Sequence, residues 1–195
     1  HAADLLAKQQ KAFQCEGEVS IAQRRDRIQR CIDLLVEYRD PLCEALQQDF
    51  GGRHAAFSLY YDILGSIGKL KFSRDNLKKW CKPERRSGVF PFSTFGAKSW
   101  VEYQPKGCVG VMGTWNAPIF TLLAPLAGIF AAGNRALLKP SDMTPATSAV
   151  LAKAVAQYFD ANELSVVEGD VEIAKMFATM PFDHLVFTGS TEVGK

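Results

Sequence analysis

Apolar residues recur at helical spacing through the first 80 positions of the chain. Ser20 and Gln23 have the Ser-x-x-Gln spacing of a capping box, and the apolar residues after them repeat every three or four positions. Asp40 followed by Pro41 predicts that a second helix begins at Pro41, with Asp40 as its N-cap. A third helical stretch is expected over 55–80. The N-terminal part of the chain is therefore expected to be helical.

The pattern changes to alternating strands and helices after position 106. Short apolar runs predict strands, and the longer stretches between them have helical spacing. Strands that alternate with helices across short loops predict an α/β fold with a parallel, doubly wound sheet. The expected strands are 107–112, 135–139, 164–167 and 184–188, and the expected helices are 118–132, 144–158 and 171–180.

The segment between these two parts is broken by proline and glycine. Its residues 99–103, Ser-Trp-Val-Glu-Tyr, alternate as in a strand. The segment could be a linker or an excursion from the main fold. We therefore divide the chain into a helical part (1–84), a connecting segment (85–106) and a strand–helix part (107–195).

Composition narrows the classes of partner. Hydrophobic residues make up 47% of the chain and charged residues 23%, and the net charge of +2 is too small to predict binding to nucleic acid or a membrane surface. The five cysteines are scattered without C-x-x-C spacing, which is evidence against a metal site and a disulfide framework. Together with the lack of a leader pattern and of a clean apolar run that could span a bilayer, they predict a cytoplasmic location.

Polar residues gather where the predicted strands end. In an open parallel sheet, ligands bind at the carboxyl ends of the strands. Asn116 follows the first strand and could either cap the next helix or present its side-chain N–H to an oxyanion, while Trp115 could fill the end of the sheet. Lys139 ends the second strand and Asp142 follows it, and the two could form an exposed turn or hydrogen-bond to ribose hydroxyls.

The last nine residues, 187–195, have two interpretations. Gly189–Lys195 match the G-x-x-x-x-G-K core of a nucleotide-triphosphate P-loop, although a P-loop normally opens its domain and this stretch follows three predicted strands. The same residues also predict a turn from a strand into a helix, where Gly189 lets the backbone approach a phosphate and the Ser190 hydroxyl can donate to it. We predict a phosphate site, with a P-loop nucleotide-binding protein as the alternative.

A set of motifs runs along the chain in a recognisable order. In the second half these are GTWNAP (113–118), AAGNRALLKPSD (131–142), VVEG (166–169) and DHLVFTGSTEVGK (183–195). The N-terminal segments RRDRIQR, LLVEYRDPLCEAL and QQDFGGR match as well. Over its whole length the chain thus resembles the aldehyde dehydrogenase superfamily. GTWN in place of the PWN of many members resembles the branch of fatty-aldehyde and bacterial coniferyl-aldehyde dehydrogenases, and we favour the coniferyl-aldehyde type.

The resemblance implies a Rossmann-like cofactor domain and the NAD-dependent oxidation of an aldehyde to its carboxylic acid. Asn116 would be the side-chain half of the oxyanion hole. Asp142 stands where many NAD-preferring members have glutamate, so that NADP use is not excluded. The residues that would bind the cofactor are Gly113, Thr114, Trp115, Lys139, Ser141, Asp142, Gly169, Phe187, Gly189, Ser190, Val193 and Gly194.

Finer roles follow from the same resemblance. The implied contacts are the adenosine ribose for Lys139 and Asp142, the pyrophosphate for Gly189 and Ser190, and the adenine for Gly169 and Val193.

In this family the nucleophilic cysteine and the general-base glutamate lie beyond the position at which this sequence ends, and none of the five cysteines here takes that role. We therefore expect the chain to carry the cofactor domain without the catalytic domain, and to have no turnover by itself. The segment from about 85 to 106 would begin the family's oligomerisation arm, which predicts a homodimer of the complete enzyme. A non-catalytic interaction fragment is the remaining alternative.

Overall fold

A four-stranded parallel sheet organises the fold in the computed structural model, which describes residues 2–195. The strands lie in the order β5-β4-β3-β6, so that Gly110 in β3 stands opposite Leu137 in β4 on one side and Leu185 in β6 on the other. The predicted parallel α/β fold is confirmed, and each strand lies within one residue of its predicted range. The strands are β3 (Cys108–Met112), β4 (Arg135–Lys139), β5 (Leu164–Val166) and β6 (His184–Phe187).

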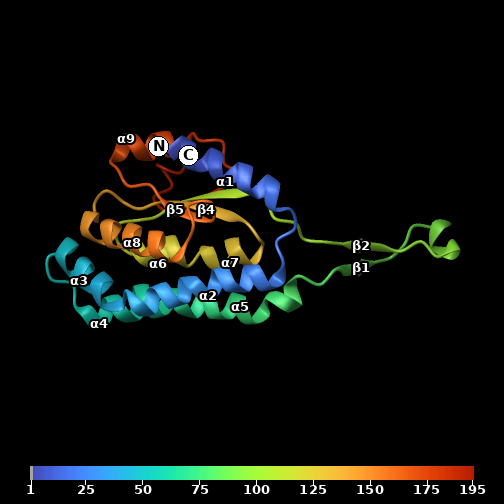
Figure 1. The fold of residues 1–195 in the computed structure, drawn as a ribbon, viewed down its shortest axis with the longest axis horizontal. Coiled ribbons are helices and arrows are strands. Elements are labelled where there is room, and N and C mark those ends of the chain that lie inside the picture. The colour runs from blue at the N-terminus through green and yellow to red at the C-terminus, as the bar shows by residue number, and fades with distance from the viewer. Residues whose placement is uncertain (1) are drawn as a thin grey trace.

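Helices cover both faces of the sheet (Figure 1). One face carries α1 (Ala2–Glu16) and α9 (Val171–Ala178). The other carries α6 (Pro118–Leu123), α7 (Leu126–Ala131) and α8 (Pro145–Tyr158). Beyond these lies an outer layer of N-terminal helices: α2 (Ile21–Glu37), α3 (Arg39–Asp49), α4 (Ala55–Ser58), the π-helix η1 (Leu59–Leu64) and α5 (Gly65–Trp80).

Side chains that alternate along the strands divide the core in two. Val109 and Val111 of β3 pack in the larger cluster with the N-terminal helices, whereas Cys108 packs with α1 and α9. In β4, Leu137 joins Cys108 in the smaller cluster. The N-terminal helices therefore share one core with the sheet. The boundaries of the parts 1–84, 85–106 and 107–195 stay a prediction.

Two helix predictions need correction. The single helix expected over 118–132 is two short helices, α6 and α7, because Pro125 has no N–H to donate to the carbonyl four residues earlier. The helix expected to begin at Pro41 begins at Arg39, and the Asp40 side chain accepts from the Arg39 guanidinium at 2.7 Å instead of capping the helix. The capping box of Ser20 is confirmed.

The N-termini of α6 and α8 are capped by distant aspartates. The sequence predicts that Thr144 and Pro145 begin α8, but the Thr144 side chain makes no cap hydrogen bond. Asp49, at the end of α3, instead accepts from the amides of Ala146 and Thr147 at 3.0 and 2.7 Å. These contacts tie the N-terminal helices to the loop that follows β4, at the carboxyl end of the sheet.

The connecting segment forms an arm that projects from the rest of the molecule (Figure 1). It is an antiparallel hairpin of β1 (Glu84–Arg86) and β2 (Ser99–Val101), with the 3-10 helix η2 (Phe92–Phe95) near its tip. The strand predicted near Ser99 is confirmed. Within residues 2–195, no helix is both long and apolar enough to cross a bilayer.

Candidate functional site

A pocket of about 670 Å³ opens at the carboxyl ends of β3 and β6. It gathers most of the predicted site residues from three separate stretches of the chain, as the strand-end rule requires. Its lining consists of Gly113, Thr114, Trp115, Asn116, Ala117, Phe120 and Thr121 after β3, Phe187, Thr188, Gly189, Ser190 and Val193 at β6, Ser141 after β4, and Tyr61 of η1.

A second pocket, of about 240 Å³, adjoins the first through Ser141 and lies at the ends of β4 and β5. Predicted residues Asp142 and Gly169 line it, together with Pro140, Pro145, Ser148, Glu168 and Asp170. Gly194 lines neither pocket and lies against the ring of Phe187. The predicted residues that line these two pockets thus lie along the carboxyl-end edge of the sheet.

Lys139 is buried beneath the second pocket rather than exposed in a turn. Its Nζ donates to the carbonyls of Pro140 and Gly169, both at 2.8 Å. Burial lowers the pKa of Lys139, against the charges of the nearby acidic groups, of which Asp142 acts most strongly. An ammonium group has three N–H donors, so one N–H of Lys139 remains after the hydrogen bonds to these two carbonyls.

Asn116 lines the first pocket with a side-chain amide whose N–H groups have no partner within residues 2–195. Its Oδ1 accepts from the Thr114 hydroxyl at 2.6 Å, and its Nδ2 has no partner within residues 2–195. Asn116 does not cap the next helix, whose N-cap is Ala117. Trp115 does not fill the end of the sheet, because 53% of its surface is exposed. Of the two roles considered for Asn116, capping the helix is therefore excluded, and donating an N–H to an oxyanion remains.

The residues after β6 form one tight turn. The amide of Gly194 donates to the carbonyl of Ser190 at 3.1 Å, and the amide of Val193 donates to the Ser190 hydroxyl at 3.4 Å. The predicted helix is represented only by this turn, in the part of the chain described. A Cβ on Gly189 would lie 2.4 Å from the Phe187 ring, so a larger residue there would have to displace that ring. The amides of Thr191 and Glu192 make no hydrogen bond within residues 2–195 and can serve an anion.

Several residues at the site escaped prediction. Glu168 and Asp170 flank Gly169 at a strand end, so the strand-end rule could have found them. Tyr61 lies on a helix far from the other lining residues in sequence, and nothing in its local pattern marks it.

Asp62 is fully buried beside Arg53. Burial raises the pKa of Asp62, although two backbone amide donors and the charge of Arg53 act to lower it.

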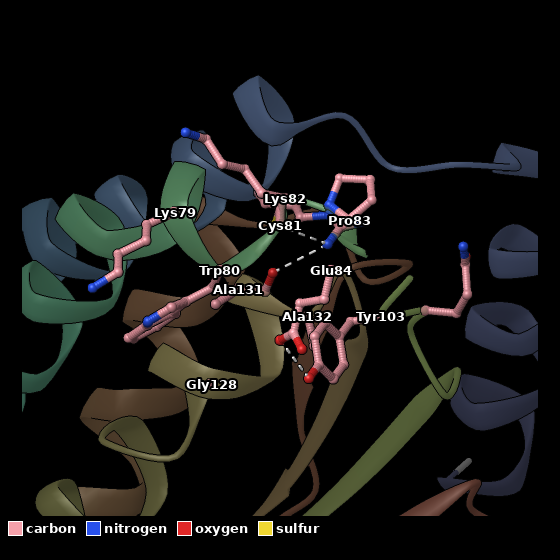
Figure 2. A pocket seen from close by; sticks show the side chains of 12 residues that line it. Lys79, Trp80, Cys81, Lys82, Pro83, Glu84, Tyr103, Gly128, Ala131 and Ala132 are labelled. Atoms are coloured by element: carbon pink, nitrogen blue, oxygen red, sulfur yellow. Dashed lines mark hydrogen bonds between the residues drawn. The ribbon is translucent and has the colours of Figure 1, made fainter. Parts of the chain in front are cut away.

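A further cavity, of about 540 Å³, lies at the root of the arm (Figure 2). Figure 2 shows Tyr103 and Glu84 pointing toward one another, and the Tyr103 hydroxyl donates to the Glu84 carboxylate at 2.9 Å. Arg24 donates to the carbonyl of Ala131 at 3.3 Å. The first hydrogen bond lies within the arm and the second joins α2 to α7, and no predicted site residue lines this cavity.

The cysteines lie away from both strand-end pockets. Cys108 is buried at the amino end of β3, and burial raises its pKa to about 12, with a further contribution from the charge of Asp183. Such a thiol is almost entirely protonated at neutral pH and is a poor nucleophile. Among residues 2–195, no group of three or more His, Cys, Asp or Glu side chains is arranged to hold a metal ion.

Comparison with known proteins identifies the family to which this site belongs. The family model described as "Aldehyde dehydrogenase family" matches residues 1–195. The chain belongs to the aldehyde dehydrogenase family. The P-loop match at Gly189–Lys195 is therefore a coincidence of spacing within an aldehyde dehydrogenase sequence.

The relatives of this aldehyde dehydrogenase chain extend well beyond its length. It is 47% identical over 190 residues to a coniferyl aldehyde dehydrogenase of Pseudomonas sp. (strain HR199), covering 97% of this chain and 39% of that protein. It is 46% identical to a probable coniferyl aldehyde dehydrogenase of Caulobacter vibrioides, covering 98% of this chain and 40% of the relative.

Solved structures of aldehyde dehydrogenases also match this chain. The substrate-bound state of Staphylococcus aureus AldH matches with a TM-score of 0.91 at 28% identity, covering 98% of this chain and 41% of that one. A Mycobacterium tuberculosis aldehyde dehydrogenase complexed with NAD+ matches with a TM-score of 0.82 at 28% identity, covering 99% of this chain and 40% of that one.

Proposed function

We propose that the complete protein oxidises an aldehyde to the carboxylic acid with NAD, and that this chain supplies the cofactor site and the oxyanion donor. The observation that supports the proposal is the unpartnered side-chain amide of Asn116, which lines the first pocket, and that pocket adjoins the second at Ser141. The names of the relatives that align over almost the whole chain support the same activity.

The two strand-end pockets fit a dinucleotide. The larger falls within the roughly 300–1,000 Å³ range of small-molecule sites, and the smaller continues it past Ser141. The unpaired amides after Ser190 suit a pyrophosphate, and the acidic side chain of Asp142 can accept from ribose hydroxyls. When bound there, NAD supplies the hydride acceptor.

Asn116 acts on the substrate oxygen. The hydroxyl of Thr114 holds the amide oxygen of Asn116, and Asn116 lines the pocket, so its unpartnered Nδ2 is available to donate there. When a nucleophile adds to the aldehyde carbonyl, the carbonyl oxygen gains negative charge, and a fixed N–H donor stabilises that charge. The five cysteines of this chain do not line the pocket, so we assign the nucleophile to the remainder of the complete protein.

We infer that the substrate is an aromatic aldehyde of the coniferyl type, from the names of the two relatives above. The purified complete protein is expected to reduce NAD+ with coniferyl aldehyde at a higher kcat/KM than with a short aliphatic aldehyde. The 195-residue chain by itself is expected to give no NADH. The measurement is the absorbance of NADH. A complete protein inactive with every aldehyde would contradict the proposed function, whereas a preference for aliphatic aldehydes would contradict only the substrate.

We propose that the complete protein prefers NAD to NADP. Asp142, Glu168 and Asp170 surround it, and a 2′-phosphate there would bring up to about two further negative charges. Replacing Asp142 by asparagine keeps an acceptor for the ribose and removes one charge. We expect the complete protein to prefer NAD+, and this variant to raise the kcat/KM of NADP+ relative to NAD+ roughly tenfold.

The control for this prediction is Asp33→Asn, on the exposed surface of α2, where the carboxylate accepts from Gln29. It should leave the ratio of the two cofactors unchanged. A wild-type preference for NADP+, or an Asp142→Asn ratio equal to that of the control, would show that these carboxylates do not select the cofactor.

The arm is the feature that supports a homodimer. Phe90 and Phe95 near its tip are 79% and 86% exposed, and large apolar side chains at such exposure are typical of a surface that another chain covers. We propose that the complete protein pairs with a second copy through this arm. A cytoplasmic location stays a prediction.

A further inference from the structure

A buried ion pair lies directly behind the loop that carries Asn116. Arg53, between α3 and α4, donates from Nη2 to Oδ2 of Asp62 in the π-helix η1 at 2.6 Å. The side chains are 8% and 0% exposed. A buried ion pair costs desolvation energy that well-packed apolar side chains would avoid, so its presence calls for a role beyond packing.

Asp62 holds the start of the helix that follows Asn116. Its Oδ1 accepts from the amides of Ile119 and Phe120 at 3.2 and 3.1 Å. Helix α6 has no cap from its own N-cap residue, so Asp62 takes that place from a different part of the chain. One carboxylate oxygen therefore fixes α6, and the other fixes Arg53.

Arg53 holds the loop itself. Its Nη1 donates to the backbone carbonyl of Asn116 at 3.2 Å. The guanidinium also lies over the rings of Phe50 and Phe57, 4.7 Å from each centroid. Stacking against two rings and pairing with Asp62 restrict the guanidinium to one orientation, so the carbonyl of Asn116 is held in a fixed place.

The side chain of Asn116 is fixed on the other side by two threonines. Thr121 accepts from the amide of Thr114 at 3.0 Å and donates to the carbonyl of Ala117 at 2.9 Å. Thr114 in turn donates to Oδ1 of Asn116. The backbone of Asn116 depends on Arg53 and Asp62, and the direction of its amide depends on this threonine pair.

We propose that Arg53 and Asp62 are positioning residues for the oxyanion donor: they hold the Asn116 loop so that the amide N–H meets the developing oxyanion. This inference rests on the proposed function. An apolar pair of the same size would fill the space, but it could neither donate to the Asn116 carbonyl nor cap α6.

The test uses Arg53→Lys in the complete protein. Lysine keeps the positive charge, but its single ammonium lacks the planar fork that reaches Asp62 and Asn116 together. We expect kcat to fall roughly 10–100-fold, the scale of a displaced catalytic group, with the Kd for NAD+ unchanged. Arg39→Lys is the matched control, because the Arg39 guanidinium also pairs with an aspartate, the exposed Asp40, and its kcat should equal that of wild type.

The double variant Arg53→Lys/Asn116→Ala separates positioning from a general structural role. If Arg53 acts through Asn116, the double variant has the same kcat as Asn116→Ala alone, because the group to be positioned is gone. A further fall in the double variant, or an unchanged kcat in Arg53→Lys, overturns the positioning role and leaves the proposed function standing. An unchanged kcat in Asn116→Ala overturns the oxyanion role, and the positioning role with it.

Asp62→Asn is the second variant, for the case in which Arg53→Lys does not fold. It keeps an oxygen for the amides of Ile119 and Phe120 and removes the charge that holds Arg53. We expect its kcat to fall as that of Arg53→Lys does, and the double variant Asp62→Asn/Asn116→Ala to have the same kcat as Asn116→Ala alone. A kcat equal to that of wild type overturns the inference.

Discussion

Replacing Asn116 by alanine in the complete protein is expected to lower kcat by roughly 10²–10³, the scale of one lost oxyanion donor. The reason is that a donor held by Thr114 and by the backbone contact to Arg53 needs no reorganisation when charge develops on the substrate oxygen. The amide Nδ2 makes no hydrogen bond within residues 2–195, and the Thr114 hydroxyl, which loses Oδ1 as its acceptor, is only partly buried and lies 3.4 Å from the Thr121 hydroxyl. The loss should therefore appear in catalysis rather than in stability.

The measurement is steady-state kinetics with a saturating aldehyde, together with the Kd for NAD+ and the thermal midpoint. We expect the Kd and the midpoint to stay close to those of wild type. Asn76→Ala is the matched control, because Asn76 is a partly exposed residue of α5 that does not line the pocket, and its side-chain amide donates to the Phe72 carbonyl. If Asn116→Ala turned over as fast as this control, Asn116 would not be the oxyanion donor.

The strands could be predicted closely because a buried parallel strand is a short apolar run between glycine, proline and polar residues. Arg135–Lys139 was predicted without error, and Cys108–Met112 to within one residue. The helix ends were less certain. The break at Pro125 had a local signal, yet the apolar residues on both sides of it suggested one continuous buried helix.

The strand-end rule predicted which segments would meet, and the pockets contain residues from each of them. What no local pattern could predict was how those segments are held. Asp62 caps a helix 57 residues away, and Asp49 caps one 97 residues away. A carboxylate on a helix usually indicates an exposed face, so these caps emerge only when the N-terminal helices pack against the sheet.

Removing the carboxylate of Glu163 is expected to lower the stability of the fold. Glu163 accepts from Arg27 and Arg30 of α2, each at 2.8 Å, and the side chain of Arg27 is only 3% exposed. Glu163→Ala leaves these cations with fewer partners, and breaking a buried pair costs about 3 kcal/mol or more. Arg27 keeps Glu16 as a second partner, so we expect about 3 kcal/mol and a fall in thermal midpoint of about 6–12 °C.

The effect should depend on pH in a defined direction. Burial by itself raises the pKa of Glu163, but the hydrogen bonds and charges of Arg30 and Arg27 outweigh it and lower that pKa below its usual value. A lowered pKa means that the ionised carboxylate stabilises the fold above about pH 4.3, the unfolded value, and that this contribution is lost as the pH falls through the folded pKa. The difference between wild type and Glu163→Ala should therefore be full at pH 7 and shrink in acid.

Thermal midpoints measured from neutral to acid pH provide the test, with Glu172→Ala as the control. Glu172 pairs with Lys175 on α9, but both side chains are about 70% exposed, at 70% and 68%. An exposed pair contributes less than about 1 kcal/mol, because water screens it and ordering two long side chains costs entropy. If Glu163→Ala were no less stable than this control at pH 7, or if its deficit persisted unchanged in acid, the Arg27–Glu163–Arg30 pairing would not be what holds α2 to the sheet.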